Sequence, residues 1–125
     1  MAIGTAALAS GRASIAFGVS AQATGVSSVA LGSVASSEGV GSVAAGLMSQ
    51  ASADGTVALG VQTQAKGHSA IAIGNSAQAT GQQGISIGSA NNVTGKPQVP
   101  LAVLQQLLCI IVKMVLRQKQ LAVLL

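Results

Sequence analysis

Glycine recurs in this chain at a fixed spacing of fourteen residues, and no other feature restricts the possible folds as strongly. The first series runs without a gap from Gly4 to Gly88. A second series begins at Gly11, lies halfway between the members of the first, and is broken only by Ala53. Together they hold 13 of the 16 glycines, so residues 1–96 form an internal repeat.

Each repeat unit contains two short alternating patterns. The first places large residues on either side of a small one, as in Val29-Ala30-Leu31, and the second alternates small and polar residues, as in Ala77-Gln78-Ala79. A period of two is typical of β-strands, because successive side chains point to opposite faces. A glycine every seven residues argues against helices, since each costs about 1 kcal/mol inside a helix.

Two strands and two tight corners per fourteen residues predict one coil of a parallel β-solenoid. Residues 1–96 would then form an all-β solenoid of about seven coils, in which neighbouring coils supply the core that no single coil can bury. Glycine allows a corner to adopt a positive φ without steric cost. The glycines expected at one set of corners are Gly18, Gly32, Gly46, Gly60, Gly74 and Gly88.

The composition predicts an unusually thin interior. The chain has one Phe and no Trp or Tyr, so it lacks most of the side chains that bury large areas. We expect the large residues of the first strand to point inward, toward the small residues of the second. The alanines between them would then lie outside and face another copy of the chain, although crowded sheets also tolerate small residues for other reasons. The residues expected to face another copy are Ala16, Ala30, Ala44, Ala58 and Ala72.

The repeats resemble the fourteen-residue head repeats of trimeric autotransporter adhesins, the YadA-like head family. The units that carry the resemblance are Ser28–Gly41, Thr56–Ser69 and Ala70–Gln83. The resemblance implies a left-handed parallel β-roll that assembles as a homotrimer on the outer membrane of a bacterium. It also implies attachment to host cells or to extracellular matrix such as collagen.

The chain departs from this family pattern in three ways. Ser27, His68 and Ser69 stand at positions where the family strand often opens with Asn, which weakens the expectation of collagen binding. The segment 47–55 looks like a distorted turn, because glycine occurs at 55 and not at 53. We find neither a signal peptide nor a membrane anchor, so the chain resembles a fragment that reaches the membrane only through an anchor it lacks.

The repeat stops at Lys96, and residues 97–125 contain no glycine. This tail is mostly aliphatic, and on a helix Gln106, Lys113, Arg117 and Gln120 would share one narrow face. We therefore expect a helix if the tail folds. Three hypotheses stay open: a cap over the end of the roll, a membrane-binding segment whose charge-free run is too short for a span, and an unselected extension from a frame slip.

We identify no catalytic, cofactor or metal site in the sequence. His68 is the only histidine and lies at a corner, while Glu38 and Asp54 are sixteen residues apart. The repeat region has a net charge of +1 and no basic cluster with stacking aromatics, so it does not fit a nucleic-acid surface.

The sequence therefore predicts a structural and adhesive module that is not an enzyme. A β-helix acyltransferase is the alternative, which the period of fourteen and the absence of a histidine arrangement disfavour. An ice-binding solenoid is a third hypothesis, but it would need Thr-x-Thr motifs stacked in register from coil to coil, which this sequence lacks. Outward polar residues are the candidate ligand contacts, namely Gln22, Thr24, Gln64, Gln78 and Thr80.

Overall fold

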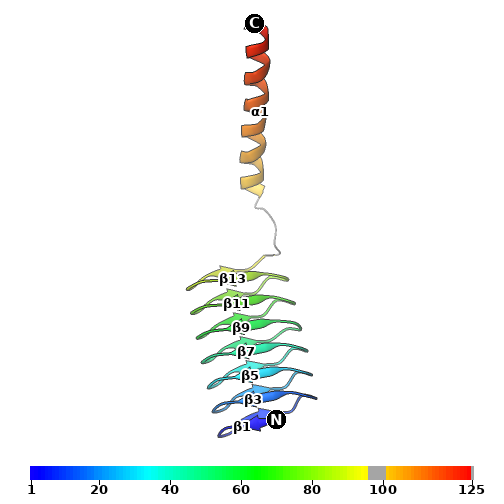
Figure 1. Cartoon of the computed structure of the whole chain (residues 1–125), viewed down its shortest axis with the longest axis vertical. Helices are drawn as coiled ribbons and strands as arrows, with labels where there is room; N and C mark the ends of the chain where they lie inside the picture. The colour runs from blue at the N-terminus through cyan, green and yellow to red at the C-terminus, as the bar shows by residue number, and fades with distance from the viewer. Residues whose placement is uncertain (96–100, 125) are drawn as a thin grey trace.

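The chain folds into a stack of β-coils followed by a single helix. The computed structural model describes residues 1–95 and 101–124, and it describes side-chain burial for 1–95 and 105–121. Residues 1–95 contain two seven-stranded parallel sheets. Each coil adds one strand to each sheet, so the coils climb in sequence order along the roll (Figure 1). The predicted parallel β-solenoid of about seven coils is confirmed.

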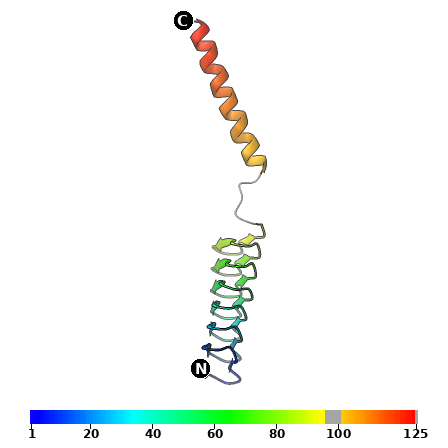
Figure 2. The same cartoon turned by 90° about the vertical axis from the view of Figure 1, so that its right-hand side faces the viewer.

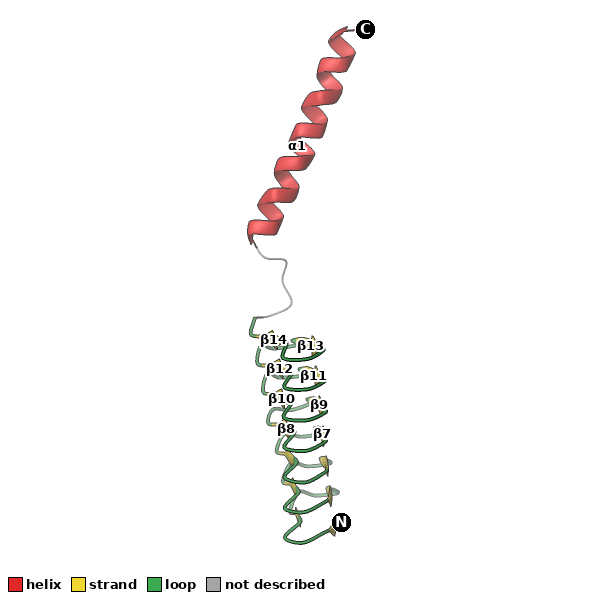
Figure 3. Cartoon of the chain, turned by 90° about the vertical axis from the view of Figure 1, so that its left-hand side faces the viewer, coloured by secondary structure: helices red, strands yellow, loops and turns green. Residues whose placement is uncertain are grey.

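The two sheets form the two walls of the roll and appear as two stacks of strands in Figure 3. Sheet I contains the odd-numbered strands β1 (Ala2–Ile3), β3 (Ile15–Phe17), β5 (Val29–Leu31), β7 (Val43–Ala45), β9 (Val57–Leu59), β11 (Ile71–Ile73) and β13 (Ile85–Ile87). Sheet II contains the even-numbered strands β2 (Leu8–Ala9), β4 (Gln22–Ala23), β6 (Ser36–Ser37), β8 (Gln50–Ala51), β10 (Gln64–Ala65), β12 (Gln78–Ala79) and β14 (Asn92–Val93).

The register between neighbouring strands is fourteen residues throughout. Ala30 pairs with Ala44 and Ala44 with Ala58 in sheet I. Gln64 pairs with Gln78 in sheet II. Because each residue lies above its counterpart in the coil before, the roll consists of ladders of similar side chains at a rise of about 4.8 Å per coil.

The corners continue the hydrogen-bonded ladder from coil to coil. At the corner after each sheet I strand from β3 onward, one residue adopts a left-handed conformation and donates its N–H to the preceding coil. Val34 has φ 59° and donates to the Val19 carbonyl at 2.9 Å, while Gln62 has φ 56° and donates to the Leu47 carbonyl at 2.8 Å. Left-handed residues other than glycine cost about 1–2 kcal/mol each, so the ladder on both sides of each corner must hold them in place.

The segment 47–55 is regular, and the predicted distortion is wrong. Gly55 has φ 67° and occupies the left-handed corner position that Ser27 and Ser69 occupy in other coils, each with φ near 56°. Its N–H donates to the Val40 carbonyl at 2.9 Å. Gly55 therefore occupies a different position in the coil from residue 53, where the second glycine series has its gap. The fourteen-residue register between neighbouring coils is preserved.

The interior of the roll is lined by alanine, serine and threonine. Ala16, Ala30, Ala44, Ala58 and Ala72 are fully buried on the inner face of sheet I, so their predicted outward orientation is wrong. Facing them are the buried alanines of sheet II, among them Ala23, Ala51 and Ala79, as predicted for that strand. A coil of fourteen residues with strands of two or three residues encloses too little space for the larger aliphatic side chains of the sheet I strands, which therefore point outward.

Buried hydroxyl groups fill the remaining inner positions. Four of them donate to a corner carbonyl three residues earlier: Ser14 to Gly11, Ser42 to Gly39 and Thr56 to Ala53 at 2.7 Å, and Ser49 to Gly46 at 3.1 Å. This local bond satisfies a polar group that would otherwise be costly to bury. Within the described residues, the Ser28 and Thr63 hydroxyls are the buried side-chain groups without a partner.

The tail forms the predicted helix, α1 (Leu101–Leu124), whereas the predicted boundary at residues 96 and 97 lies outside the described residues. Figures 1 and 2 show α1 beyond the last coil and clear of both sheets. All side chains at 105–121 are exposed, so the helix does not cover the open end of the roll as the cap hypothesis requires. None of the described helices combines the length and apolarity needed to cross a bilayer.

Candidate interaction surfaces

The outer face of sheet I is a continuous ladder of large apolar side chains. Because the alanines point inward, the residues on either side of them point out. Exposure is 53% for Phe17, 41% for Leu31 and 60% for Ile87. We call this surface the apolar face, and its members are Ile3, Ile15, Phe17, Val29, Leu31, Val43, Ala45, Val57, Leu59, Ile71, Ile73, Ile85 and Ile87.

The apolar face extends onto the adjoining corners in the middle of the roll. The corner residues Val19, Val34, Leu47, Met48 and Val61 are all exposed. Contiguous apolar surfaces of this extent are rare on soluble monomers and mark interaction sites. The single chain therefore has its larger hydrophobic side chains on the outside, where only another molecule can bury them.

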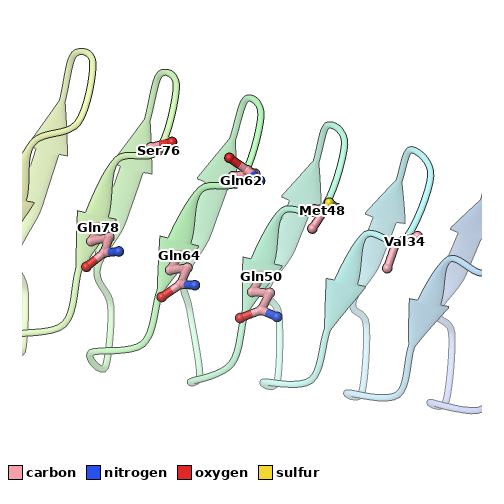
Figure 4. A pocket seen from close by; sticks show the side chains of 7 residues that line it. All are labelled: Val34, Met48, Gln50, Gln62, Gln64, Ser76 and Gln78. Atoms are coloured by element: carbon pink, nitrogen blue, oxygen red, sulfur yellow. The ribbon is translucent and has the colours of Figure 1, made fainter.

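The outer face of sheet II is polar and carries a ladder of amides. Gln50, Gln64 and Gln78 lie in register on neighbouring strands. Figure 4 shows them stacked beside the adjoining corner residues, with which they line a groove of about 270 Å³. We call this the amide groove, and its lining residues are Val34, Met48, Gln50, Gln62, Gln64, Ser76 and Gln78. Within the described residues, none of the glutamine side-chain amide groups that line the groove forms a hydrogen bond. Each of these groups can therefore donate a hydrogen bond to a ligand and accept one from it.

The predicted polar contact residues divide between this groove and its surroundings. Gln64 and Gln78 line it, whereas Gln22 lies two strands away on the same sheet. Thr24 and Thr80 follow the sheet II strands and are exposed. The sequence did not single out the other five groove residues, which are Val34, Met48, Gln50, Gln62 and Ser76.

The six predicted corner glycines have φ values from 123° to 136°, a range that residues with a side chain rarely adopt. Five of them also lack room for a side chain. A Cβ added at Gly60, for example, would lie 2.0 Å from the Gly74 carbonyl oxygen of the next coil. The second glycine series has no positive φ at Gly25 or Gly67, yet a Cβ there would lie 2.1 or 2.0 Å from the next coil. Glycine is required at these positions by close coil packing.

The few titratable residues of the roll serve local structure. Asp54 Oδ1 accepts a hydrogen bond from the Val40 N–H of the preceding coil at 2.7 Å. Glu38 Oε1 accepts from the Ser36 hydroxyl at 3.2 Å, and His68 Nδ1 lies 3.1 Å from the Ser69 hydroxyl at an exposed corner. In the part of the chain that the structure describes, no three His, Cys, Asp or Glu residues gather as a metal site would require.

A family model described as the YadA head domain repeat (2 copies) matches residues 1–18, 9–35, 37–63 and 65–91, which is more than two thirds of the chain. The chain belongs to the YadA head repeat family. The matched segments coincide with the coils of the roll, so the resemblance inferred from the repeat units is confirmed. A search of curated proteins found no match.

Membership of the YadA head family identifies the roll as a module of the adhesin head type. This is a family of adhesins and not of enzymes, which agrees with a fourteen-residue coil and a solitary exposed histidine. The two faces of the YadA head roll differ in chemistry. One presents aliphatic ladders and the other amide ladders, so the two faces suit different partners.

Proposed function

We propose that the chain is the adhesive head of a trimeric autotransporter adhesin, displayed on the surface of a bacterium. The observation that carries the proposal is the opposition of the apolar face on sheet I and the amide groove on sheet II. Three copies would bury their apolar faces against one another. Their amide grooves would then face outward and be available to a ligand.

The apolar face supplies the driving force for trimerisation. Burial of apolar surface contributes about 25 cal/mol per Å², and this face carries large aliphatic side chains and the only Phe of the chain. The interior of one coil holds only small side chains, so a lone roll gains comparatively little from its own core. Self-association therefore completes the hydrophobic burial that the single chain leaves undone, and it replaces the alanine contact expected from the sequence.

The trimer is tested by sedimentation of the full chain and of two lysine variants in the coil of β11 and β12. Ile73→Lys places a charge on the apolar face, where a threefold assembly would bring three cations together, and we expect monomers. Gln78→Lys places the same charge on sheet II, and we expect trimers. A wild-type chain that sediments as a stable monomer would contradict the proposal.

We propose that the ligand of the head is a repetitive host polymer such as collagen in the extracellular matrix. Unpaired amides recur along the amide groove with the rise of the coil, and three copies would present three such grooves. Weak contacts repeated along one polymer combine through effective concentration, so the affinity of the assembly exceeds that of one groove.

Adhesion is tested by binding of the trimer to immobilised collagen. The triple variant Gln50→Ala/Gln64→Ala/Gln78→Ala removes the groove amides, and we expect a loss of binding. Gln22→Ala removes an amide of the same sheet outside the groove and should bind as the wild type does. Collagen binding that survives the triple variant would exclude the amide groove, and no binding by the wild type would exclude collagen.

A further inference from the structure

Helix α1 exposes large apolar side chains around most of its circumference. Between residues 105 and 121, nine such side chains are each between 48% and 60% exposed. They are Leu107, Leu108, Ile110, Ile111, Val112, Met114, Val115, Leu116 and Leu121. The helix packs against neither sheet, so the roll does not shield them from water. A surface of this kind needs a partner.

Four of the seven polar residues of α1, including two of its three cations, share one narrow strip. At 3.6 residues per turn, Gln106, Lys113, Arg117 and Gln120 fall within about 60° of the circumference. Gln105, Gln118 and Lys119 lie outside this strip. The tail contains no Asp or Glu, so its three cations have no acidic residue beside them on the helix. A long apolar arc opposite a basic strip is typical of helices that lie in the interface of a lipid bilayer.

We propose that α1 binds the surface of an anionic lipid bilayer. The apolar arc would enter the boundary between headgroups and acyl chains, and Lys113 and Arg117 would meet the lipid phosphates. Lys119, near the end of the helix, has a long side chain that can reach the headgroups. Because Lys113 and Arg117 interrupt the apolar sequence in its middle, the helix lies along the bilayer and does not span it.

Two observations favour lipid over a second copy of the helix. A coiled coil buries only two positions in every seven. The apolar residues of α1 occupy a far wider arc, so a coiled coil would leave many of them in water. Parallel copies would also bring uncompensated cations close together, whereas anionic headgroups neutralise them.

The test is co-flotation of the full chain with vesicles of phosphatidylcholine alone or of phosphatidylcholine mixed with phosphatidylglycerol. We expect preferential binding to the anionic vesicles that weakens as salt is raised. Each basic residue near an anionic surface contributes about 1 kcal/mol, so Lys113→Gln/Arg117→Gln should bind these vesicles about thirtyfold more weakly. Ile111→Ser/Val115→Ser should abolish binding. The control Lys66→Gln, on the roll, should bind as the wild type does.

Lipid binding by α1 does not depend on the proposed adhesive function, and a failure of one can be distinguished from a failure of the other. Sedimentation without lipid reports the assembly of the roll, and circular dichroism shows that each variant is folded. Absence of flotation, equal flotation with neutral vesicles, or flotation unchanged in Lys113→Gln/Arg117→Gln would each overturn the lipid assignment. An altered oligomeric state in Ile111→Ser/Val115→Ser, without flotation of the wild type, would assign α1 to contacts between copies.

Discussion

Replacing Ala44 with leucine tests which face of the sheet I strands points into the roll. Ala44 is fully buried and lies between Ala30 and Ala58 of the neighbouring coils. The substitution adds three carbon atoms to an interior that holds only small side chains. Overpacking costs about 1–3 kcal/mol in cores that can shift. Here hydrogen-bonded ladders hold both walls, so we expect the upper end, about 3 kcal/mol.

Ala45 provides a matched control because it is the next residue on the same strand. It lies on the apolar face between Leu31 and Leu59 and is half-buried. Leucine at this position would continue a ladder that its neighbours already form. Because leucine already occupies positions 31 and 59 beside it in the ladder, we expect Ala45→Leu to change the free energy of unfolding by no more than about 0.5 kcal/mol.

Thermal unfolding of the full chain, followed by circular dichroism, separates the two variants. For a folded unit of this size, 1 kcal/mol shifts Tm by about 4–8 °C. Ala44→Leu should therefore lower Tm by about 12–24 °C, and Ala45→Leu should lower it by less than about 4 °C. If Ala45→Leu is the more damaging change, the large residues point inward and our account of the core is refuted.

Four further substitutions are measured by denaturant unfolding. Gly60→Ala should destabilise the fold by more than about 3 kcal/mol, because the added Cβ would lie 2.0 Å from the Gly74 carbonyl oxygen and the residue has φ +123°. Gly41→Asn should cost less than about 1 kcal/mol, because Gly41 has φ +64° and open space around it. Equal costs for the two variants would show that close packing of the coils does not require glycine at position 60. Ser42→Ala should destabilise by about 1–3 kcal/mol, because Ser42 bonds the Gly39 carbonyl. Ser28→Ala at the same position of another coil should stabilise by about 1 kcal/mol, because its buried hydroxyl has no partner, and a clear loss of stability there would show that one exists.

The repeat period was sufficient to predict the solenoid, its number of coils and its corners. The spacing of Gly18 and Gly32 sets the length of a coil, and glycine is needed there both for its φ and for the close approach of coils. The pattern also predicted that Ala23 and its counterparts in sheet II face inward. These features depend on residue order and local sterics, which are properties of the chain itself.

The orientation of the sheet I strands could not be predicted by the usual rule that large residues lie inside. An alternating strand such as Val29-Ala30-Leu31 is compatible with either orientation, because its period of two places its large and small residues on opposite faces but does not say which face is inner. The length of the repeat did contain a signal for the inner face, because a coil of fourteen residues with two corners leaves little width for a core and so favours small residues inside. The apolar face was missed for this reason, whereas Val34 and Met48 of the amide groove lie in corners, whose side-chain directions the repeat pattern did not predict.

The sequence by itself determined the coil length, the corners and the composition of each ladder, because these follow from glycine spacing and strand periodicity. Only the tertiary structure decided which ladder lies inside. Ala44 lies between the two closely spaced walls and Val43 lies on the outer face, so the small residues form the core and the large ones are left for a partner. That choice depends on the distance between segments seven residues apart in the chain, which no local pattern contains.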